Sequence, residues 1–206
     1  MAAVTNDWEA TLDAHRSHQR DAIHRAAVAL ATEHGVAGIG MAEVARRAGI
    51  SRATLYKYFN NVEDILASYM ISEVDEEHRR LRERMAALDS PMARLRTVMT
   101  HLLTYFSSPD HRSASTVIGP GQFSPAVAAR VGDAMQQVHD LVSDEVAAAA
   151  REGELRSDID ADVLAEVFQH LLTAGRSLVM SGRATADDAA DMMWTQYVHG
   201  AAVPEG

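Results

Sequence analysis

The chain has 206 residues, of which 47% are hydrophobic, and a formal net charge of −10. This length and composition suit a globular protein with a proper core, and the absence of cysteine excludes disulfide bonds and thiolate metal sites. There is no stretch of 18 apolar residues and no basic, apolar leader, so we expect a soluble, cytoplasmic protein without a membrane span.

The negative charge is unevenly distributed along the chain. Residues 14–60 contain seven Arg or Lys residues against three acids, a net charge of +4 that leaves −14 on the remainder. A basic segment joined to an acidic body is typical of a DNA-binding module fused to a domain that stays off DNA. Good helix formers are abundant and long β-branched runs are missing, so we predict an all-α protein.

Hydrophobic periodicity predicts about nine helices. The first runs from residue 11 or 16 to residue 33. Two short helices, 41–48 and 52–59, follow; Gly49 suits the left-handed turn that ends one, and Ser51 suits the N-cap of the other. A long helix then covers residues 62–88, and we expect its charged stretch at 75–84 to be solvated.

Two Ser-Pro pairs mark the helix starts in the second half of the chain. Ser90 with Pro91, and Ser124 with Pro125, each predict an N-cap followed by proline at the first helical position. Residues 107–123 are rich in proline and glycine and predict a loop with one short helix at 112–118. Helices at 163–180 and 185–199 end the pattern.

Residues 41–59 meet the requirements of a helix-turn-helix, in which the second of two short helices enters the major groove. Ile50 and Leu55 would fill the angle between the helices. The alternative is a helical corner whose polar side is merely solvated. Side chains able to donate to phosphates or to base edges lie on the second helix and beside it. These candidate DNA-binding residues are Arg47, Ser51, Arg52, Thr54, Tyr56, Lys57 and Tyr58.

The segment 35–66 closely resembles the DNA-binding segment of TetR-family transcriptional regulators. The shared residues are Val44, Ala45, Ala48, Gly49, Ile50, Ser51, Leu55, Tyr56, Phe59, Glu63, Ile65 and Leu66. The resemblance implies that residues 52–58 form the recognition helix, with Tyr56 and Tyr58 on the DNA backbone. It further implies a DNA-binding domain at 1–61 with three helices, followed by a helical ligand-binding and dimerisation domain at 62–206. The expected function is a homodimeric repressor that a small effector releases from a double-stranded DNA operator.

Two positions depart from the family pattern. Gly40 stands where family members often have Thr or Ser, and Val62 where many have Lys. Glycine is a tolerable N-cap, so the fold is not threatened. Losing both phosphate contacts should make DNA binding less dependent on salt than in a relative that has both.

The second domain contains a candidate effector pocket in which apolar bulk, methionine and a few polar tips combine. Ordinary core packing is the alternative for each of these residues. They are Met99, Leu103, Phe106, Phe123, Met135, His139 and Phe168. No cluster of Arg or Lys accompanies them, which favours a neutral or cationic, mainly apolar effector.

The helix predicted at 163–180 is apolar over most of its circumference, so we expect it to be buried from more than one direction. With the last helix it is our candidate for a four-helix dimer interface, the alternative being a central helix in a monomer. The interface candidates are Leu171, Leu172, Gly175, Met192, Met193 and Tyr197. Dimerisation suits DNA binding, because symmetric half-sites need two recognition helices.

The sequence offers little support for enzyme chemistry or for a cofactor. Histidines lie on different predicted helices, and only Glu166 and His170 share a spacing compatible with metal ligands. No nucleophile-elbow motif occurs. We therefore expect no enzyme activity and no metal. Two alternatives to an effector-controlled repressor remain: a regulator whose second domain binds a protein partner, and a small helical enzyme.

Overall fold

Runs of helix-forming residues, separated by glycine turns and serine caps, produce the whole architecture. The computed structural model describes residues 3–117 and 123–201, and within those ranges it contains nine α-helices, one 3-10 helix and no strand. The prediction of an all-α protein with about nine helices is confirmed. None of the described helices is both long and apolar enough to cross a bilayer.

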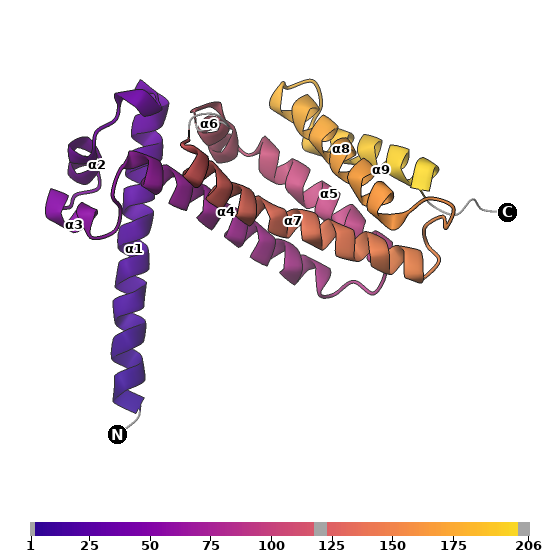
Figure 1. Ribbon diagram of the computed structural model, residues 1–206, viewed down its shortest axis with the longest axis horizontal. Helices are drawn as coiled ribbons and strands as arrows, with labels where there is room; N and C mark the ends of the chain where they lie inside the picture. The colour runs from indigo at the N-terminus through magenta and orange to yellow at the C-terminus, as the bar shows by residue number, and fades with distance from the viewer. Residues whose placement is uncertain (1–2, 118–122, 202–206) are drawn as a thin grey trace. The chain divides into compact units, whose positions relative to one another are not determined.

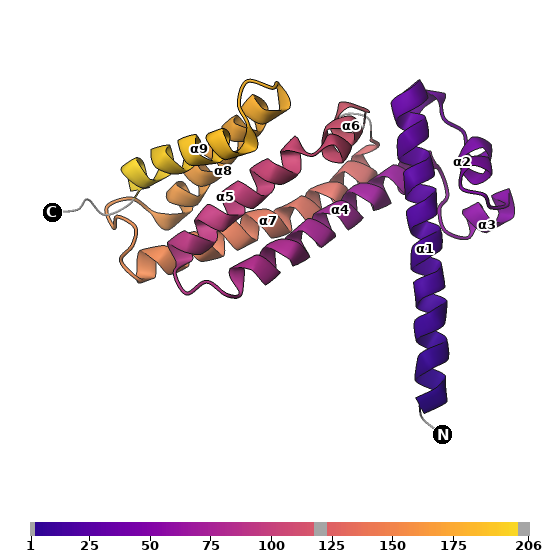
Figure 2. The ribbon, with the colours of Figure 1, turned by 180° about the vertical axis from the view of Figure 1, so that it is seen from behind.

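Figures 1 and 2 show the helices from two opposite sides, coloured in chain order. They are α1 (Ala3–His34), the 3-10 helix η1 (Val36–Gly38), α2 (Met41–Arg47), α3 (Arg52–Tyr56), α4 (Val62–Met85), α5 (Pro91–Ser107), α6 (Pro109–Val117), α7 (Pro125–Arg151), α8 (Ala161–Met180) and α9 (Ala186–Ala201).

Several helix boundaries differ from the predicted ones. The first helix begins at residue 3 rather than 11 or 16, α3 ends at Tyr56 rather than residue 59, and α6 begins at Pro109 rather than residue 112. Residue 118, where the short helix was expected to end, lies outside the described residues. The Ser90 cap is confirmed, because the Ser90 hydroxyl accepts a hydrogen bond from the amide of Ala93 and Pro91 opens the helix.

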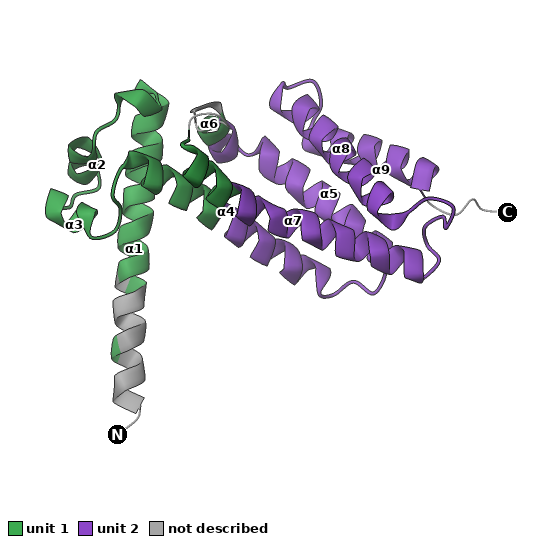
Figure 3. Ribbon diagram, viewed as in Figure 1, with its two compact units in different colours: residues 1–72, 113–131 green, residues 73–112, 132–206 purple. Residues whose placement is uncertain are grey.

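The described chain forms two compact units, coloured separately in Figure 3. Unit 1 comprises residues 1–72 and 113–131, and unit 2 comprises residues 73–112 and 132–206. The helices α4, α6 and α7 therefore each contribute residues to both units. The predicted boundary between a DNA-binding domain and a ligand-binding domain at residue 61 divides the chain by function rather than by internal contacts, and it stays a prediction.

Unit 1 is organised around the inner face of α1. Its apolar residues meet those of α2, α3 and the start of α4 in one buried cluster. This packing stabilises α3, because a helix of five residues is not stable in isolation. The fully buried large side chains of this cluster are Ile23, Leu30, Leu55, Ile65 and Leu66.

Unit 2 is built on α5, α8 and α9, which pack against one another and run side by side in both ribbon views (Figures 1 and 2). Phe168 of α8 and Tyr197 of α9 meet edge to face at 5.1 Å between ring centroids. The close approach of these helices depends on Gly175, where an added Cβ would lie 3.0 Å from Leu103 Cδ2. Residues of α4 and α7 complete this core.

Candidate nucleic-acid interface

The turn between α2 and α3 has the geometry that a helix-turn-helix requires. Gly49 has a φ of 70°, the left-handed conformation that glycine adopts without steric cost. The amide of Gly49 donates to the Arg46 carbonyl and the amide of Ile50 donates to the Ala45 carbonyl, which is the Schellman arrangement that ends a helix sharply. The prediction of a left-handed Gly49 is confirmed.

The start of α3 is fixed by its N-cap. The Ser51 hydroxyl accepts a 3.0 Å hydrogen bond from the amide of Thr54, and the two hydroxyls of Ser51 and Thr54 lie 2.8 Å apart. The predicted Ser51 cap is confirmed. Leu55 is completely buried in the core of unit 1 and orients the helix, so that the opposite side of α3 faces solvent.

The outward side of α3 carries the candidate DNA-binding residues. Arg52, Tyr56 and Lys57 are exposed, and Tyr56 retains 49% of its accessible surface, a high value for an aromatic side chain. Thr54 is half-buried, and its hydroxyl faces that of Ser51. A guanidinium and a phenol on α3, with an ammonium group at its C-cap, can donate to phosphates and to base edges.

Tyr58 and Arg47 are held differently from the residues on α3. Tyr58 is half-buried, and its hydroxyl donates a hydrogen bond to Gln19 of α1. Arg47 donates through both terminal nitrogens to the carboxylate of Glu33, at 2.7 and 2.5 Å. The Arg47 guanidinium also lowers the pKa of that carboxyl group. The role of all seven candidates in DNA binding stays a prediction.

A neutral histidine supports the interface from within unit 1. Burial lowers the pKa of His24 to about 4, so its imidazole is uncharged at neutral pH. Its Nε2 lies 3.2 Å from the Ser68 hydroxyl, and its ring contacts those of Phe59 and Tyr69. The histidine therefore acts as a packed, polar link between α1 and α4.

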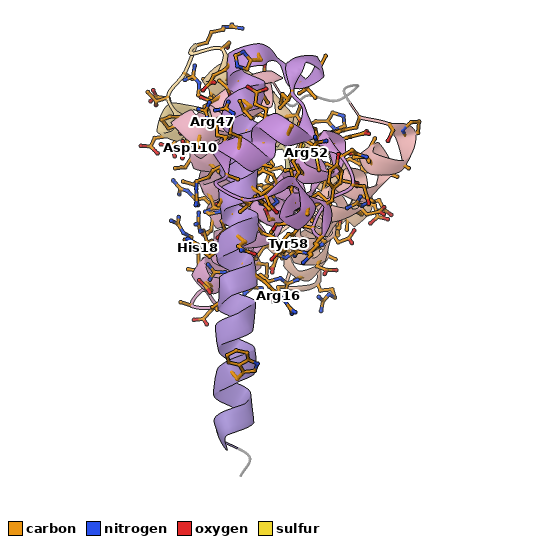
Figure 4. The ribbon with its side chains drawn as sticks, turned by 90° about the vertical axis from the view of Figure 1, so that its left-hand side faces the viewer. Arg16, His18, Arg47, Arg52, Tyr58 and Asp110 are labelled. Atoms are coloured by element: carbon orange, nitrogen blue, oxygen red, sulfur yellow. The ribbon has the colours of Figure 1, made fainter. Side chains whose placement is uncertain are left out.

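The residue list drawn from the sequence did not include two arginines of α1. Arg16 and Arg20 lie beside Tyr58 and together with Ser17 line a hollow of about 270 Å³. In Figure 4, Arg52, Tyr58 and Arg16 lie to one side of α1, whereas His18 lies to the other. The sequence feature that could have identified them is their spacing of four residues within the basic segment, because this spacing places both arginines on one face of a helix.

The effector-pocket candidates are divided between the two units. Leu103, Met99, Phe106 and Phe168 meet in the core of unit 2, where the first two and Phe168 are completely buried. Phe123 instead packs in unit 1 against Ala67, Val127 and Val131. Met135 and His139 are exposed on α7. The structure therefore gathers four of the seven residues, and a pocket made from them stays a prediction.

The dimer-interface candidates lie mostly inside unit 2. Gly175, Met193 and Tyr197 are buried within the chain, and Leu171 and Leu172 are half-buried against its core. Met192 is exposed, at 47%. Two residues outside the candidate list, Val163 and Val167 of α8, are also exposed, at 48% and 43%. These three residues are the large apolar side chains of α8 and α9 that are exposed, and their role in a dimer stays a prediction.

The described part of the chain contains no group of three His, Asp or Glu side chains that could hold a metal ion.

Comparison with known proteins finds a family match for the segment that contains the helix-turn-helix. Residues 23–69 match the bacterial regulatory proteins of the tetR family. An uncharacterized HTH-type transcriptional regulator of Mycobacterium tuberculosis is 38% identical over 98 residues, which cover 47% of each chain. The match thus spans about half the length of this curated relative.

Solved structures resemble a larger part of the chain. The FadR regulator from Bacillus subtilis, in complex with stearoyl-CoA, is 18% identical with a TM-score of 0.75, covering 87% of this chain and 97% of its own. AibR, in complex with isovaleryl coenzyme A and operator DNA, is 21% identical with a TM-score of 0.66, covering 86% and 97%. At these identities the similarity shows a shared fold, with an N-terminal helix-turn-helix and a helical remainder.

Proposed function

We propose that this chain is a member of the tetR family of bacterial regulatory proteins, which its residues 23–69 match, and that it is a homodimeric repressor released from its operator by a small, mainly apolar effector. On this proposal the chain regulates transcription by binding DNA. The observation that carries the proposal is the Gly49–Ser51 turn, which presents Arg52, Tyr56 and Lys57 on one exposed surface. A repressor of this kind acts in the cytoplasm, where its operator is.

The DNA-binding part of the proposal is tested by a protection assay on the DNA that flanks the gene for this chain. The wild-type protein should protect a two-fold symmetric site. Because a well-placed base contact contributes about 1–3 kcal/mol, Arg52→Ala should weaken operator binding by about tenfold or more without unfolding the protein. Tyr56→Ala removes an expected contact with the DNA backbone and should also weaken operator binding without unfolding the protein. Arg183→Ala, which removes an exposed arginine between α8 and α9, is the matched control. Full protection by folded Arg52→Ala and Tyr56→Ala variants refutes the assignment of α3.

The homodimer is supported by the symmetry that paired half-sites demand and by the apolar surface of α8 and α9. Val163 and Val167 stand one helical turn apart and are both exposed, and Met192 is exposed on α9. Sedimentation equilibrium should show a dimer, and Val167→Asp with Met192→Asp should yield folded monomers. If the two aspartates leave the dimer intact, the surface formed by Val163, Val167 and Met192 is not the dimer interface.

The effector is proposed to act on the core of unit 2. Met99, Leu103 and Phe168 are completely buried and in contact, so an effector must separate helices that the described conformation packs together. Such a ligand shifts the population toward an open conformation only by its difference in affinity for the two. Two proteins with this fold are bound to acyl-CoA ligands, which makes acyl chains the natural first probes.

Helix α4 is the continuous helix through which effector binding could alter the DNA-binding segment. It begins in unit 1, beside the helix-turn-helix, and ends in unit 2, with Leu81 and Met85 in the same cluster as Met99. We propose that effector binding tilts α4 and moves the two recognition helices out of register. Neutral acyl esters of increasing chain length should then displace labelled operator at stoichiometric concentration. If no apolar compound displaces it, the alternative of a protein partner on α8 and α9 is favoured.

A further inference from the structure

A hollow on unit 1 lies next to the recognition segment but outside the helix-turn-helix. It has a volume of about 270 Å³ and is lined by Arg16, Ser17 and Arg20 of α1 together with Tyr58. All four residues belong to unit 1. In Figure 4, Arg16 and Tyr58 lie on the same side of α1.

The two arginines are presented by one face of a continuous helix. They are four residues apart, which is about one turn and about 6 Å along the helix axis. Both are exposed, and α1 runs without a break from Ala3 to His34. Their guanidinium groups are therefore attached to a helical backbone. The conformational entropy that is lost when an anion binds comes from the side chains and not from the backbone.

Tyr58 ties this face of α1 to the recognition segment. Its hydroxyl donates to Gln19, which lies between Arg16 and Arg20 in the sequence, and its ring forms a wall of the hollow. Tyr58 follows α3 by two residues. Any molecule that contacts the exposed end of α3 and continues along Tyr58 therefore meets the two arginines.

A second, polar hollow of about 240 Å³ continues the first, since Arg20 and Tyr58 line both. Its only acidic lining residue is Asp64, which is 3.2 Å from Arg130 and accepts a 3.1 Å hydrogen bond from Asn60. The charge of Asp64 is thus balanced locally by Arg130. The lining of the two hollows together carries three arginines against one carboxylate and is suited to an anion.

We propose that Arg16 and Arg20 bind a phosphate group of the DNA backbone beside the bases contacted by α3. The proposal rests on the DNA-binding function proposed above and extends it to a part of α1 that precedes the family segment. Guanidinium groups donate paired, charge-assisted hydrogen bonds to phosphate oxygens. Such contacts fix position on the duplex and carry no sequence information.

Arg25 provides a matched control for charge. It is an exposed arginine of the same helix, and it is nine residues from Arg16, which places it on the opposite side of α1. Arg16→Ala, Arg20→Ala and the double variant are therefore compared with Arg25→Ala, which removes the same charge. Arg16→Lys with Arg20→Lys retains the charges and tests the need for guanidinium geometry.

The measurement is the affinity for operator duplex and for random duplex over a range of salt concentrations. The double variant should bind both DNAs more weakly, and the slope of log affinity against log salt should fall by about one per lost phosphate contact. One contact with a slope of −0.9 corresponds to about an eightfold loss at 0.1 M salt relative to 1 M. The ratio of operator to random affinity should be unchanged, and Arg25→Ala should resemble wild type.

Three results separate the possible failures. If the double variant matches Arg25→Ala in affinity and slope, the arginines bind no DNA phosphate and the inference is overturned. If inorganic phosphate stabilises the wild type but not the double variant while DNA affinity is equal, the hollow takes a free anion, which also overturns it. If Arg52→Ala retains full operator binding, the proposed function itself has failed.

Discussion

Both terminal nitrogens of Arg47 contact the carboxylate of Glu33, at 2.7 and 2.5 Å, and thereby join the end of α2 to the end of α1. Arg47 is the one candidate DNA-binding residue of α2, and its guanidinium is already engaged by an acid of its own chain. Glu33 therefore competes with any phosphate that approaches Arg47. Since the pair is exposed, solvent weakens it, and a phosphate can displace the carboxylate.

Replacing Glu33 tests this competition. Glu33→Gln should raise affinity for operator and random duplex a few-fold and steepen the salt dependence, because Arg47 becomes available to a phosphate. Filter binding or fluorescence anisotropy at several salt concentrations measures both quantities. Glu43→Gln is the control, since it removes one negative charge from α2 next to Arg46 but leaves the Arg47 pair intact. Equal behaviour of the two variants would show that the effect is one of net charge.

The absence of two family contacts predicts a shallow salt dependence that substitution can restore. Gly40 is the N-cap of α2 and has no side-chain hydrogen bond, its φ is −114°, and an added Cβ would meet nothing within 4 Å. Gly40→Ser therefore fits and should also stabilise α2 by a few tenths of a kcal/mol. Together with Val62→Lys it should steepen the salt slope by about one per restored contact. Unchanged slopes in the folded variants would disprove the assigned positions.

Two glycine-to-alanine substitutions should have opposite effects on stability. At Gly175 the new methyl group would lie 3.0 and 3.1 Å from side-chain atoms of Leu103 and Met193, and overpacking costs about 1–3 kcal/mol. The better helix propensity of alanine returns about 1 kcal/mol, so the net loss is about 1 kcal/mol. Gly132 of α7 is exposed with nothing within 4 Å, so Gly132→Ala should gain about 0.5–1 kcal/mol. Urea unfolding of both variants measures the contrast.

Acidification should destabilise both units through one histidine in each. Burial lowers the pKa of His24 to about 4, and burial, with a smaller effect of Arg176, lowers the pKa of His111 to about 4. The unfolded chain binds a proton at each site near pH 6.5 but the folded chain does not, so stability is complete above about 6.5 and falls as the pH drops towards 4.

Unfolding experiments at pH 7 and pH 5 measure this loss. Each histidine should contribute less than about 1.4 kcal/mol per pH unit, because residual solvent contact screens part of the effect. His24→Gln retains a donor for Ser68 and should remove its share of the pH dependence, as should His111→Gln. A pH dependence that neither substitution reduces would assign the loss to other groups.

The helix-turn-helix could be predicted residue by residue because its determinants are local. Gly49 and Ser51 specify the turn by backbone conformation and by a cap three residues away, and the structure contains both features. The end of α3 was less predictable. The amides of Lys57 and Tyr58 donate to carbonyls three residues earlier, which tightens the chain before the apolar pattern ends at Phe59.

The start of α1 and of α6 escaped prediction for two different reasons. Of the α1 residues before Ile23 whose burial is described (residues 8, 14 and 16–22), none is buried, so this part of the helix shows no buried stripe that a hydrophobic period could reveal. At α6 a third Ser-Pro pair, Ser108 with Pro109, uses the same cap as Ser90, with the Ser108 hydroxyl accepting from the amide of His111. The prolines and glycines of residues 107–123 predicted a loop there, so the cap at Ser108 was not recognised.

Contacts between distant residues could not be predicted from the pattern. The charged stretch at 75–84 was expected to be solvated, which is wrong for Glu77 and His78, both of which are buried. The Glu77 carboxylate lies 2.9 Å from Nε2 of His101 on α5, a partner 24 positions away. Similarly, Val163 and Met193 both appear as apolar residues in the sequence, but only the packing of α8 on α9 decides that the first is exposed and the second is buried.

The hollow formed by Arg16 and Arg20 has a consequence for how quickly the protein finds its target. Two guanidinium groups on a phosphate hold every stretch of duplex equally well, so they lengthen each visit to the chromosome without favouring any sequence. Longer visits allow one-dimensional sliding, which shortens the search, but they also divert molecules to the vast excess of other sites. The number of arginines on this side of α1 therefore affects two quantities in opposite ways. More arginines allow longer sliding along the DNA, but they also leave a smaller fraction of the protein unbound and able to reach the operator.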